Sequence, residues 1–253
     1  MESLKSVGYW NNHTYVRLNV KDYVEDFCGW NPLKELIAYA GSDRNQAFIT
    51  ALFLTGGRVS ETLALAKDNF EVRQNEGVII VRNMKLLKRY KKLSETVDSL
   101  GHRRWITERL VKTRKPFPIV AREPYTPILL EWLNKTEGLL FRSPYKTGFP
   151  LSRSWAYKFI RNLDKELPEQ LKRQLGLDKP VMKDGKKVRD KLHLWLHWFR
   201  SQRASQLVTD YGYEVIDLIG YFNWERYDTA LRYAKKGWRG LASKMLSAQV
   251  TYT

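Results

Sequence analysis

Side chains suited to phosphate chemistry lie in two short tracts of the C-terminal half of the chain. His197 and Arg200 occur in the tract HWFR at 197–200, and a tryptophan and two tyrosines follow in NWERYDTALRY at 223–233. Residues three positions apart lie on one face of a helix, so His197 and Arg200 can present an imidazole and a guanidinium to one phosphate. A guanidinium suits this role because its planar fork donates two parallel hydrogen bonds to phosphate oxygens.

A second candidate arginine lies upstream, in LTGGRVSETLAL at 54–65. Arg58 follows a glycine pair, which is typical of a helix end, and stands at the start of the next expected helix. The first N–H groups of a helix and its dipole favour a bound anion there. Glu61, three residues on, can hold the guanidinium by a salt bridge. Each tract alone is common on ordinary surface helices. Two arginines, a histidine and a tyrosine together indicate phosphoryl transfer in which the tyrosine becomes covalently linked to the phosphate.

The net charge points to a polyanionic partner. The chain has 253 residues, enough for one large domain or a domain with a small appendage, and a formal charge of +17. Nucleic acid is the usual partner of such a chain, and a membrane surface is the alternative. Because the sequence contains no 18-residue apolar run, signal peptide or lipidation motif, we expect double-stranded DNA and no membrane.

The cysteine and histidine content argues against disulfides and metal sites. Cys28 is the only cysteine, so no intrachain disulfide can form, and a reducing, cytoplasmic location fits. The four histidines are scattered and have no cysteine partners. We therefore expect neither a bound metal ion nor another cofactor.

Hydrophobic periodicity predicts a mainly α-helical protein with one small antiparallel β-sheet, an α+β class. The clearest strand is 77–82, and its partner is expected within 109–120. The basic segment 83–108 between them either extends this ribbon or forms a mobile insertion, and the charged segment 164–191 is interpreted as a solvated excursion. Helices are expected from Asn31 onwards and then at 44–54, 60–66, 127–133, 152–163, 192–211, 213–219 and 227–235.

These tracts together resemble those of the tyrosine recombinases, the family of Xer-type recombinases and of integrases, including archaeal and mobile-element integrases. The tract at 54–65 is similar to the family's first arginine box, TGxRxSExxxL, and HWFR at 197–200 is similar to its H-x-x-R box. The tract IGYFNWERYDTALRY at 219–233 is similar to the closing box, in which His or Trp stands nine residues before the nucleophilic tyrosine. The resemblance covers residues 30–240 and implies the catalytic-domain fold of that family.

The resemblance also implies a mechanism. Tyr233 would attack a scissile DNA phosphate and form a 3′-phosphotyrosine, without a metal ion or another cofactor. Arg58 and Arg200 would neutralise the non-bridging oxygens. His197 would bind the phosphate or help deprotonate the tyrosine, and Trp224 would support the site by packing. The implied function is that of a site-specific DNA recombinase.

The closing box departs from the family pattern and leaves two alternatives. The usual Gly-His pair is Gly220-Tyr221 here, three residues before the tryptophan that fits by spacing. Either a small insertion precedes Trp224, or Tyr221 takes the place of the His or Trp. We prefer Trp224, because no tyrosine lies at the required distance from Tyr221. Tyr227 is a competing nucleophile.

The family's catalytic lysine lies on the β-hairpin that follows the first arginine box. Lys85, at the end of the predicted strand, is the nearest counterpart and would protonate the departing 5′-oxygen, with Lys88, Lys112 and Lys115 as alternatives. The other basic residues of this region would contact backbone phosphates, largely without regard to sequence. The predicted DNA-binding residues are Lys88, Arg89, Lys91, Lys92, Arg103, Arg104, Lys112 and Lys115.

Family members usually carry a core-binding domain before the first arginine box, and the stretch before Arg58 is too short for one. We expect a lead-in or linker segment at 1–29 and a catalytic domain at 30–253, with the core-binding domain absent. The segment 237–253 can form a short amphipathic tail helix that docks on a neighbouring copy, so a dimer or tetramer on DNA is expected.

Two other functions remain open. A type IB topoisomerase-like enzyme has the same arginine, lysine, histidine and tyrosine chemistry and relaxes DNA without exchanging strands. A DNA-binding domain with a degenerate active site would keep the basic surface alone. Nicking of DNA separates enzyme from binder, and joining of two different duplexes separates recombinase from topoisomerase.

Overall fold

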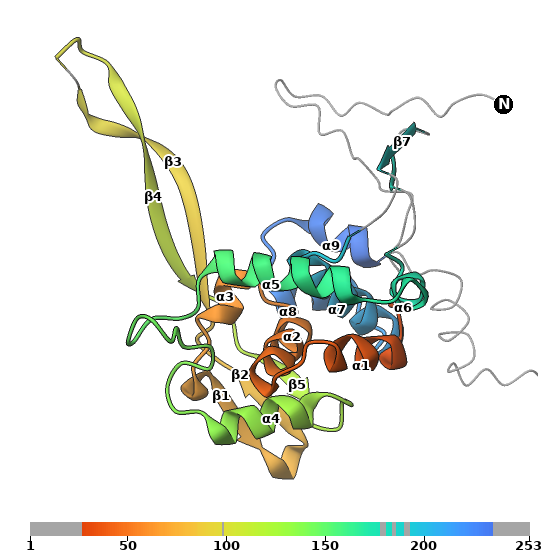
Figure 1. The fold of residues 1–253 in the computed structure, drawn as a ribbon. Coiled ribbons are helices and arrows are strands. Elements are labelled where there is room, and N and C mark those ends of the chain that lie inside the picture. Colours follow the sequence, from red (N-terminus) through yellow and green to blue (C-terminus); the bar gives the residue numbers. More distant parts are fainter. Residues whose placement is uncertain (1–26, 98, 178–180, 184–185, 190–192, 235–253) are drawn as a thin grey trace, which may run out of the picture.

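The computed structural model describes residues 27–97, 99–177, 181–183, 186–189 and 193–234. Helices predominate over strands in this part of the chain, with a small sheet at one side and a long projecting ribbon (Figure 1). The helices are α1 (Trp30–Ala38), α2 (Asp43–Thr55), α3 (Val59–Leu63), α4 (Thr126–Lys135), α5 (Arg153–Glu166), α6 (Glu169–Gln174), α7 (Leu196–Asp210), α8 (Val215–Phe222) and α9 (Tyr227–Ala234), with short 3₁₀ turns at Lys67–Asn69 and Gln74–Glu76. The strands are β1 (Phe70–Arg73), β2 (Val78–Val81), β3 (Lys85–Val97), β4 (Arg103–Thr113), β5 (Phe117–Val120), β6 (Val181–Lys183) and β7 (Lys186–Arg189).

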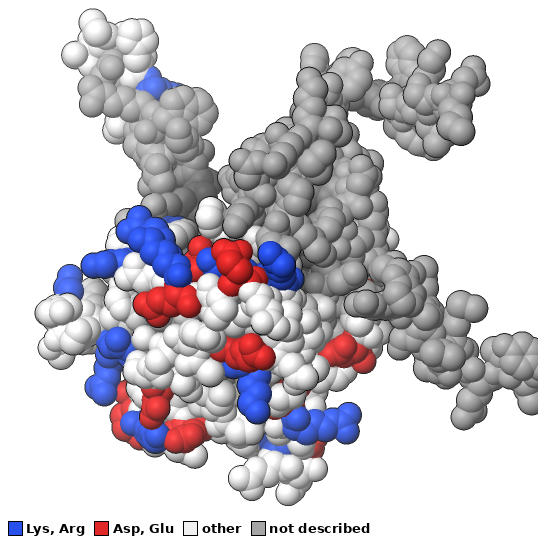
Figure 2. Space-filling view, turned by 45° about the vertical axis from the view of Figure 1, so that its right-hand side comes forward, with Lys and Arg blue, Asp and Glu red and all other residues white. Residues whose placement is uncertain are grey.

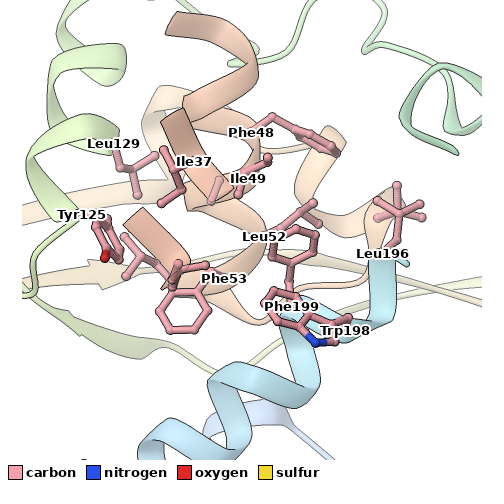
Figure 3. Close-up of a cluster of buried hydrophobic side chains, with 14 of the residues drawn as sticks. Ile37, Phe48, Ile49, Leu52, Phe53, Tyr125, Leu129, Leu196, Trp198 and Phe199 are labelled. Atoms are coloured by element: carbon pink, nitrogen blue, oxygen red, sulfur yellow. The ribbon is translucent and has the colours of Figure 1, made fainter. Parts of the chain in front are cut away.

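Helix α2 forms the centre of the hydrophobic core. Every residue from Ala47 to Thr55 is buried, so this part of the helix is surrounded by other elements on all sides. Its Leu52 and Phe53 lie among side chains of α1, α4 and α7 (Figure 3). Phe48 packs against Phe141 and against Trp155 and Phe159 of α5. Full burial of each such side chain contributes about 1.5–3 kcal/mol. The end of α2 is therefore a rigid platform for the turn that follows it.

The sheet has the strand order β1-β2-β5, with both pairs antiparallel. Its central strand and its partner at 117–120 confirm the sequence prediction. Between these two strands the chain leaves the sheet as the antiparallel β3–β4 ribbon, which projects from the body (Figure 1). The first of the two interpretations of 83–108 is thus correct. Strand β1 was not expected, because four residues between polar turns carry too little alternation to be recognised.

The prediction of a solvated excursion at 164–191 is wrong for its first part. Leu167, Leu171 and Leu175 are buried around α6, and a small β6–β7 hairpin follows. Leucines four residues apart share one face of a helix. The charged residues between them lower the average hydrophobicity of the segment, so its composition does not show this pattern. Helix α3 is also shorter than expected, ending at Leu63. The expected tail helix and the lead-in before residue 27 lie outside the described residues.

No helix in the described ranges is both long and apolar enough to cross a membrane.

A buried ion pair joins α7 to the rest of the fold. Arg203 donates from Nη1 to both carboxylate oxygens of Glu123, each at 2.8 Å, and from Nε and Nη2 to the hydroxyl of Tyr221 at 3.2 and 3.0 Å. Tyr211 donates to the same carboxylate at 2.8 Å. Arg203 and Glu123 are both almost wholly inaccessible, so neither charge can be hydrated if the other is removed.

We predict that Arg203→Met lowers the free energy of unfolding by about 3–5 kcal/mol, because it leaves a buried carboxylate without its partner. Lys135→Met, which removes a cation paired with Asp43 and Glu131 at the exposed surface, is the control and should change stability little. Denaturant titration followed by circular dichroism measures both. Equal effects of the two substitutions would contradict a structural role for the buried pair.

Candidate active site

Two glycines allow three segments to meet at the end of α2. Gly56 adopts the left-handed conformation, with φ +54°, and a Cβ there would collide with the ring of Phe222 from α8. A Cβ on Gly57 would collide with the Cε of Met84 at the base of the ribbon. The glycine pair of the first arginine tract therefore brings α8 and the ribbon base against the start of α3.

Arg58 and Glu61 lie at the start of α3. The Glu61 carboxylate accepts from the backbone N–H of Arg58 at 2.8 Å and pairs with its Nη1 at 3.2 Å. The carboxylate is buried, whereas the Arg58 side chain is 50% exposed. Glu61 thus fixes the first turn of the helix and leaves the guanidinium at the surface.

Arg200, on α7, is 3% exposed and lies on the other side of Glu61. Its Nη1 is 3.9 Å from the second Glu61 carboxylate oxygen and donates to the carbonyl of Gly56 at 2.6 Å. Its Nη2 donates to the carbonyl of Phe222 at 3.5 Å. Burial lowers the pKa of Arg200 to about 10, against the opposing effect of Glu61. The cation is held by helix-end carbonyls and by one carboxylate that it shares with Arg58.

Two aromatic rings, those of Phe222 and Trp224, lie between Arg200 and Tyr233. Phe222 stacks on Trp224 at 4.5 Å between ring centroids, and Trp224 stacks on Tyr233 at 5.2 Å. The Arg200 guanidinium lies 4.7 Å from the Phe222 ring centroid and 5.4 Å from that of Trp224. The Tyr233 hydroxyl is 3.4 Å from the Oγ of Ser201, the residue after Arg200 on α7. Stacking therefore fixes the α9 tyrosine beside the helix that carries Arg200.

The two other tyrosines of the closing tract lie in different surroundings. Tyr221 is buried, donates its hydroxyl to the carbonyl of Leu54 at 2.8 Å, and accepts from Arg203. Burial raises the pKa of Tyr221, which makes it a poor nucleophile. Tyr227 begins α9 and is more than half exposed. The geometry favours Trp224 over Tyr221 as the supporting aromatic residue.

His197 and the ribbon lysines surround this centre. His197 is exposed in the first turn of α7, one turn before Arg200. Lys85 is exposed and begins β3 directly after Met84, which contacts Gly57. Lys112 lies near the end of β4, with its Nζ 3.5 Å from a carboxylate oxygen of Glu225, next to Trp224.

The remaining predicted DNA-binding residues lie on or beside the ribbon. Arg103 and Lys115 are exposed. The backbone positions of Lys88, Arg89, Lys91, Lys92 and Arg104 lie within β3 and β4, and their side chains are outside the described part of the structure.

Arg114 is a functional candidate that the sequence did not reveal. It is fully buried between the ribbon and β5, and donates from Nε to the carbonyl of Tyr221 and from Nη1 to that of Thr55, both at 2.8 Å. Its guanidinium lies 3.7 Å from the centroid of the Phe117 ring. Burial, and then the neighbouring charge of Arg200, lower the pKa of Arg114 to about 9. Arg114 therefore ties the ribbon base to the ends of α2 and α8.

The exposed side of α5 is a second feature missed by the sequence reading. Arg153, Lys158, Arg161 and Lys165 are exposed along it, and the Arg153 guanidinium lies 5.9 Å from the ring centroid of Tyr157. These cations recur at helical spacing, and no acidic residue lies between them on that side. A prediction based on hydrophobicity alone does not use this charge pattern. Lysine and arginine side chains also gather on the body below the ribbon base, beside acidic ones (Figure 2).

No group of three or more histidine, cysteine, aspartate or glutamate residues within the described ranges is placed to hold a metal ion.

Comparison with solved structures identifies the fold. A XerA recombinase superposes with a TM-score of 0.51 at 18% identity, over 91% of this chain and 66% of the other. The chain described here has the tyrosine recombinase fold. The XerH site-specific recombinase bound to its difH substrate gives a TM-score of 0.48 at 15% identity, over 90% of this chain and 56% of that chain. The Tn1549 transposon integrase in complex with transposon right end DNA gives a TM-score of 0.49 at 14% identity, over 84% of this chain and 62% of that chain.

The chain thus spans about two thirds of XerA and just over half of XerH. No family model and no curated protein sequence matches it. The predicted fold, mainly α-helical with a small antiparallel sheet, is confirmed. The assignment of individual site residues to catalytic roles stays a prediction.

We predict that Gly56→Ala disrupts the site because the added methyl group displaces Phe222 and, with it, the stacked Trp224 and Tyr233. Gly41→Ala is the matched control, since Gly41 also has a positive φ, +78°, but has no atom within 4 Å of its would-be Cβ. Both should lose about 1–2 kcal/mol to backbone strain, and only the Gly56 variant should also lose DNA cleavage. Thermal unfolding and a cleavage assay, run in parallel, measure the two effects. Equal cleavage by the two variants would show that the close packing at Gly56 is not needed for function.

Proposed function

We propose that this chain is the catalytic domain of a tyrosine-type site-specific DNA recombinase, or integrase, that breaks and rejoins DNA through a 3′-phosphotyrosine. The observation that carries the proposal is the convergence of three distant segments on Arg200. Arg58 shares the Glu61 carboxylate with Arg200, and Trp224, which stacks on Tyr233, lies 5.4 Å from the Arg200 guanidinium. The tyrosine recombinase fold, shared with a XerA recombinase, supports it, as does the formal charge of +17. Double-stranded DNA is therefore the proposed substrate.

The two arginines would bind the scissile phosphate. Arg58 is half exposed and Arg200 is buried, and both contact the same carboxylate. The two bonds from Arg200 to Gly56 and Phe222 use two of the five N–H donors of a guanidinium. A phosphate placed against both arginines would gain charge-assisted bonds, which strengthen as negative charge builds on its non-bridging oxygens in the transition state.

Cleavage would proceed by transesterification. The Tyr233 oxygen forms a bond to phosphorus while the bond from phosphorus to the 5′-oxygen breaks. The tyrosine proton passes to His197 or to solvent, and Lys85 protonates the departing 5′-oxygen. Because the phosphodiester is conserved in the phosphotyrosine, the reverse attack by a 5′-hydroxyl reseals the strand without a further energy source.

We predict that Tyr233→Phe abolishes the covalent protein–DNA adduct and that Tyr227→Phe retains it. The measurement is incubation with nicked suicide duplexes that release a short fragment, followed by a denaturing gel. An adduct that survives in the Tyr233 variant and disappears in the Tyr227 variant would move the nucleophile to the start of α9. Tight DNA binding without an adduct from the unaltered chain would favour a DNA-binding domain with a degenerate site.

We predict that Arg58→Gln slows adduct formation by hundreds-fold, about 3–4 kcal/mol in the barrier, through the loss of one phosphate-binding group. The matched control is Arg73→Gln, another partly exposed arginine held by glutamates, which lies on the edge strand β1. Single-turnover rates on saturating DNA separate binding from chemistry. Equal rates for the two variants would exclude Arg58 from the site.

The general acid is tested by changing the leaving group. Lys85 begins β3 and Lys112 reaches Glu225 from near the end of β4, so either can serve the site. A 5′-thiolate leaves without a proton, so a variant that lacks the general acid should recover cleavage on DNA with a 5′-bridging sulfur. We predict this recovery for Lys85→Ala and not for Lys112→Ala. The reverse result would assign the role to Lys112.

A topoisomerase-like activity is separated by its products. A recombinase joins strands of two different duplexes, whereas a topoisomerase only relaxes supercoiled DNA.

Assembly into a dimer or tetramer on DNA remains part of the proposal, and gel filtration of the DNA complex tests it.

A further inference from the structure

Arg114 closes the base of the β3–β4 ribbon. Its backbone N–H donates to the carbonyl of Met84 at 2.8 Å, next to the first pair of the ribbon, in which Lys85 lies opposite Thr113. Met84 and Arg114 are both buried, and the Nη1 of Arg114 lies 3.7 Å from the Met84 sulfur. Beyond this point the ribbon projects from the body (Figure 1). Lys85 is therefore the first ribbon residue after a buried contact that Arg114 makes.

The side chain of Arg114 reaches from the ribbon to the ends of two helices. Its Nε donates to the carbonyl of Tyr221 in α8, and its Nη1 donates to that of Thr55 in α2, both at 2.8 Å. The Thr55 hydroxyl accepts from the backbone N–H of Gly57 at 3.1 Å, one residue before Arg58. One guanidinium thus connects the ribbon base to the segment that carries Arg58.

Arg200 bridges the same two helix ends one residue further along. It donates to the carbonyls of Gly56 and Phe222, at 2.6 and 3.5 Å. These are the residues directly after the two whose carbonyls accept from Arg114. A shift of either helix end would therefore move the ribbon base and Arg200 relative to each other.

The connection made by Arg114 contains no ion pair. In the part of the chain that the structure describes, Arg114 has carbonyl, sulfur and aromatic contacts but no carboxylate partner. Arg203, which serves the fold, contacts both oxygens of Glu123 instead. Burying an unpaired charge is costly, so a contact that only stabilised the fold would be made more favourably by an apolar side chain. A planar guanidinium differs from such a side chain in holding several acceptors at fixed separations.

We propose that Arg114 is a positioning residue that holds the general acid, Lys85, at a fixed place relative to the phosphate-binding Arg58 and Arg200. The inference rests on the proposed function, in which Lys85 gives a proton to the departing 5′-oxygen. A general acid acts only within hydrogen-bond reach of the atom that it protonates. Lys85 lies on the ribbon, whereas the arginines that bind the phosphate lie on the body. Arg114 joins the two, because its backbone holds the ribbon and its side chain holds the helix ends.

Two DNA substrates separate positioning from a purely structural role. A 5′-oxygen leaving group needs the general acid, and a 5′-bridging sulfur does not, because a thiolate leaves without a proton. Arg114→Lys keeps the positive charge but replaces the fork by a single ammonium group. It should slow cleavage of ordinary DNA by about 100-fold, the cost of displacing a catalytic group by about 1 Å, and that of sulfur-containing DNA by less than about tenfold. An unfolded fraction of the variant lowers both rates equally and cancels in their ratio.

The matched control is Arg203→Lys. Arg203 is also a buried arginine in contact with Tyr221, but it contacts the hydroxyl of that residue and has no contact with the ribbon base. Its substitution should slow cleavage of the two substrates by the same factor. Equal factors for Arg114→Lys as well, or an unchanged rate of this variant on ordinary DNA, would overturn the proposal.

A double variant tests whether Arg114 acts through Lys85. Lys85→Ala combined with Arg114→Lys should cleave ordinary DNA as fast as Lys85→Ala alone, because no lysine is left to position. Losses that multiply in the double variant would mean that Arg114 acts independently of Lys85, and would overturn the proposal.

Hydrogen exchange of the free protein measures the connection without DNA. Arg114→Lys should speed exchange of the backbone amides at positions 57 and 114, which donate to Thr55 and Met84 respectively. Unchanged exchange at both positions would contradict the proposal. Failure of the proposed function has a different signature. No adduct from the unaltered chain on either nicked DNA would reject the recombinase activity, whereas an adduct with equal losses on the two substrates would reject only the role of Arg114.

Discussion

The candidate site depends on buried guanidinium groups that are held by the carbonyl ends of two helices. The last carbonyls of α2, at Thr55 and Gly56, accept from Arg114 and Arg200 respectively. The last carbonyls of α8, at Tyr221 and Phe222, accept from the same two arginines. A helix C-terminus carries a partial negative charge and unsatisfied acceptors, so two converging helix ends can stabilise cations with little help from carboxylates. An arginine whose charge is already balanced by a carboxylate would attract a phosphate more weakly.

The three buried arginines show this distinction. Arg203 contacts both oxygens of Glu123, and although its burial favours a lower pKa, Tyr221 and Glu123 raise that pKa above its ordinary value. It serves the fold. The pKa values of Arg114 and Arg200 are instead lowered by burial, so each keeps a positive charge that its surroundings only partly balance. In the proposed function, this charge would attract the scissile phosphate, with Arg58 held by Glu61 beside it. Close packing at Gly56 and Gly57 makes the arrangement possible, because a Cβ at Gly56 would collide with the Phe222 ring and one at Gly57 with the Met84 methyl group.

The sequence predicted the parts of this molecule that have strong local patterns. Apolar periodicity identified α2 and α7, β-branched residues identified β2, and the spacing of Arg58, His197, Arg200, Trp224 and Tyr233 identified the fold. Local patterns did not reveal Arg114, since its role depends on carbonyls about 60 and 107 residues away along the chain. The buried leucines around α6 were hidden by the charges between them. What could not be predicted was, in each case, a contact between distant segments.

Mass spectrometry of the trapped protein–DNA adduct would identify the residue that is linked to DNA. A trapped adduct, trimmed with nuclease and cleaved after glutamate, yields the peptide 226–253, which contains Tyr227, Tyr233 and Tyr252. We expect a nucleotide joined through its 3′-phosphate to Tyr233, the tyrosine stacked on Trp224 beside Arg200. A nucleotide on Tyr227 or Tyr252, or on a residue outside this peptide, would contradict it.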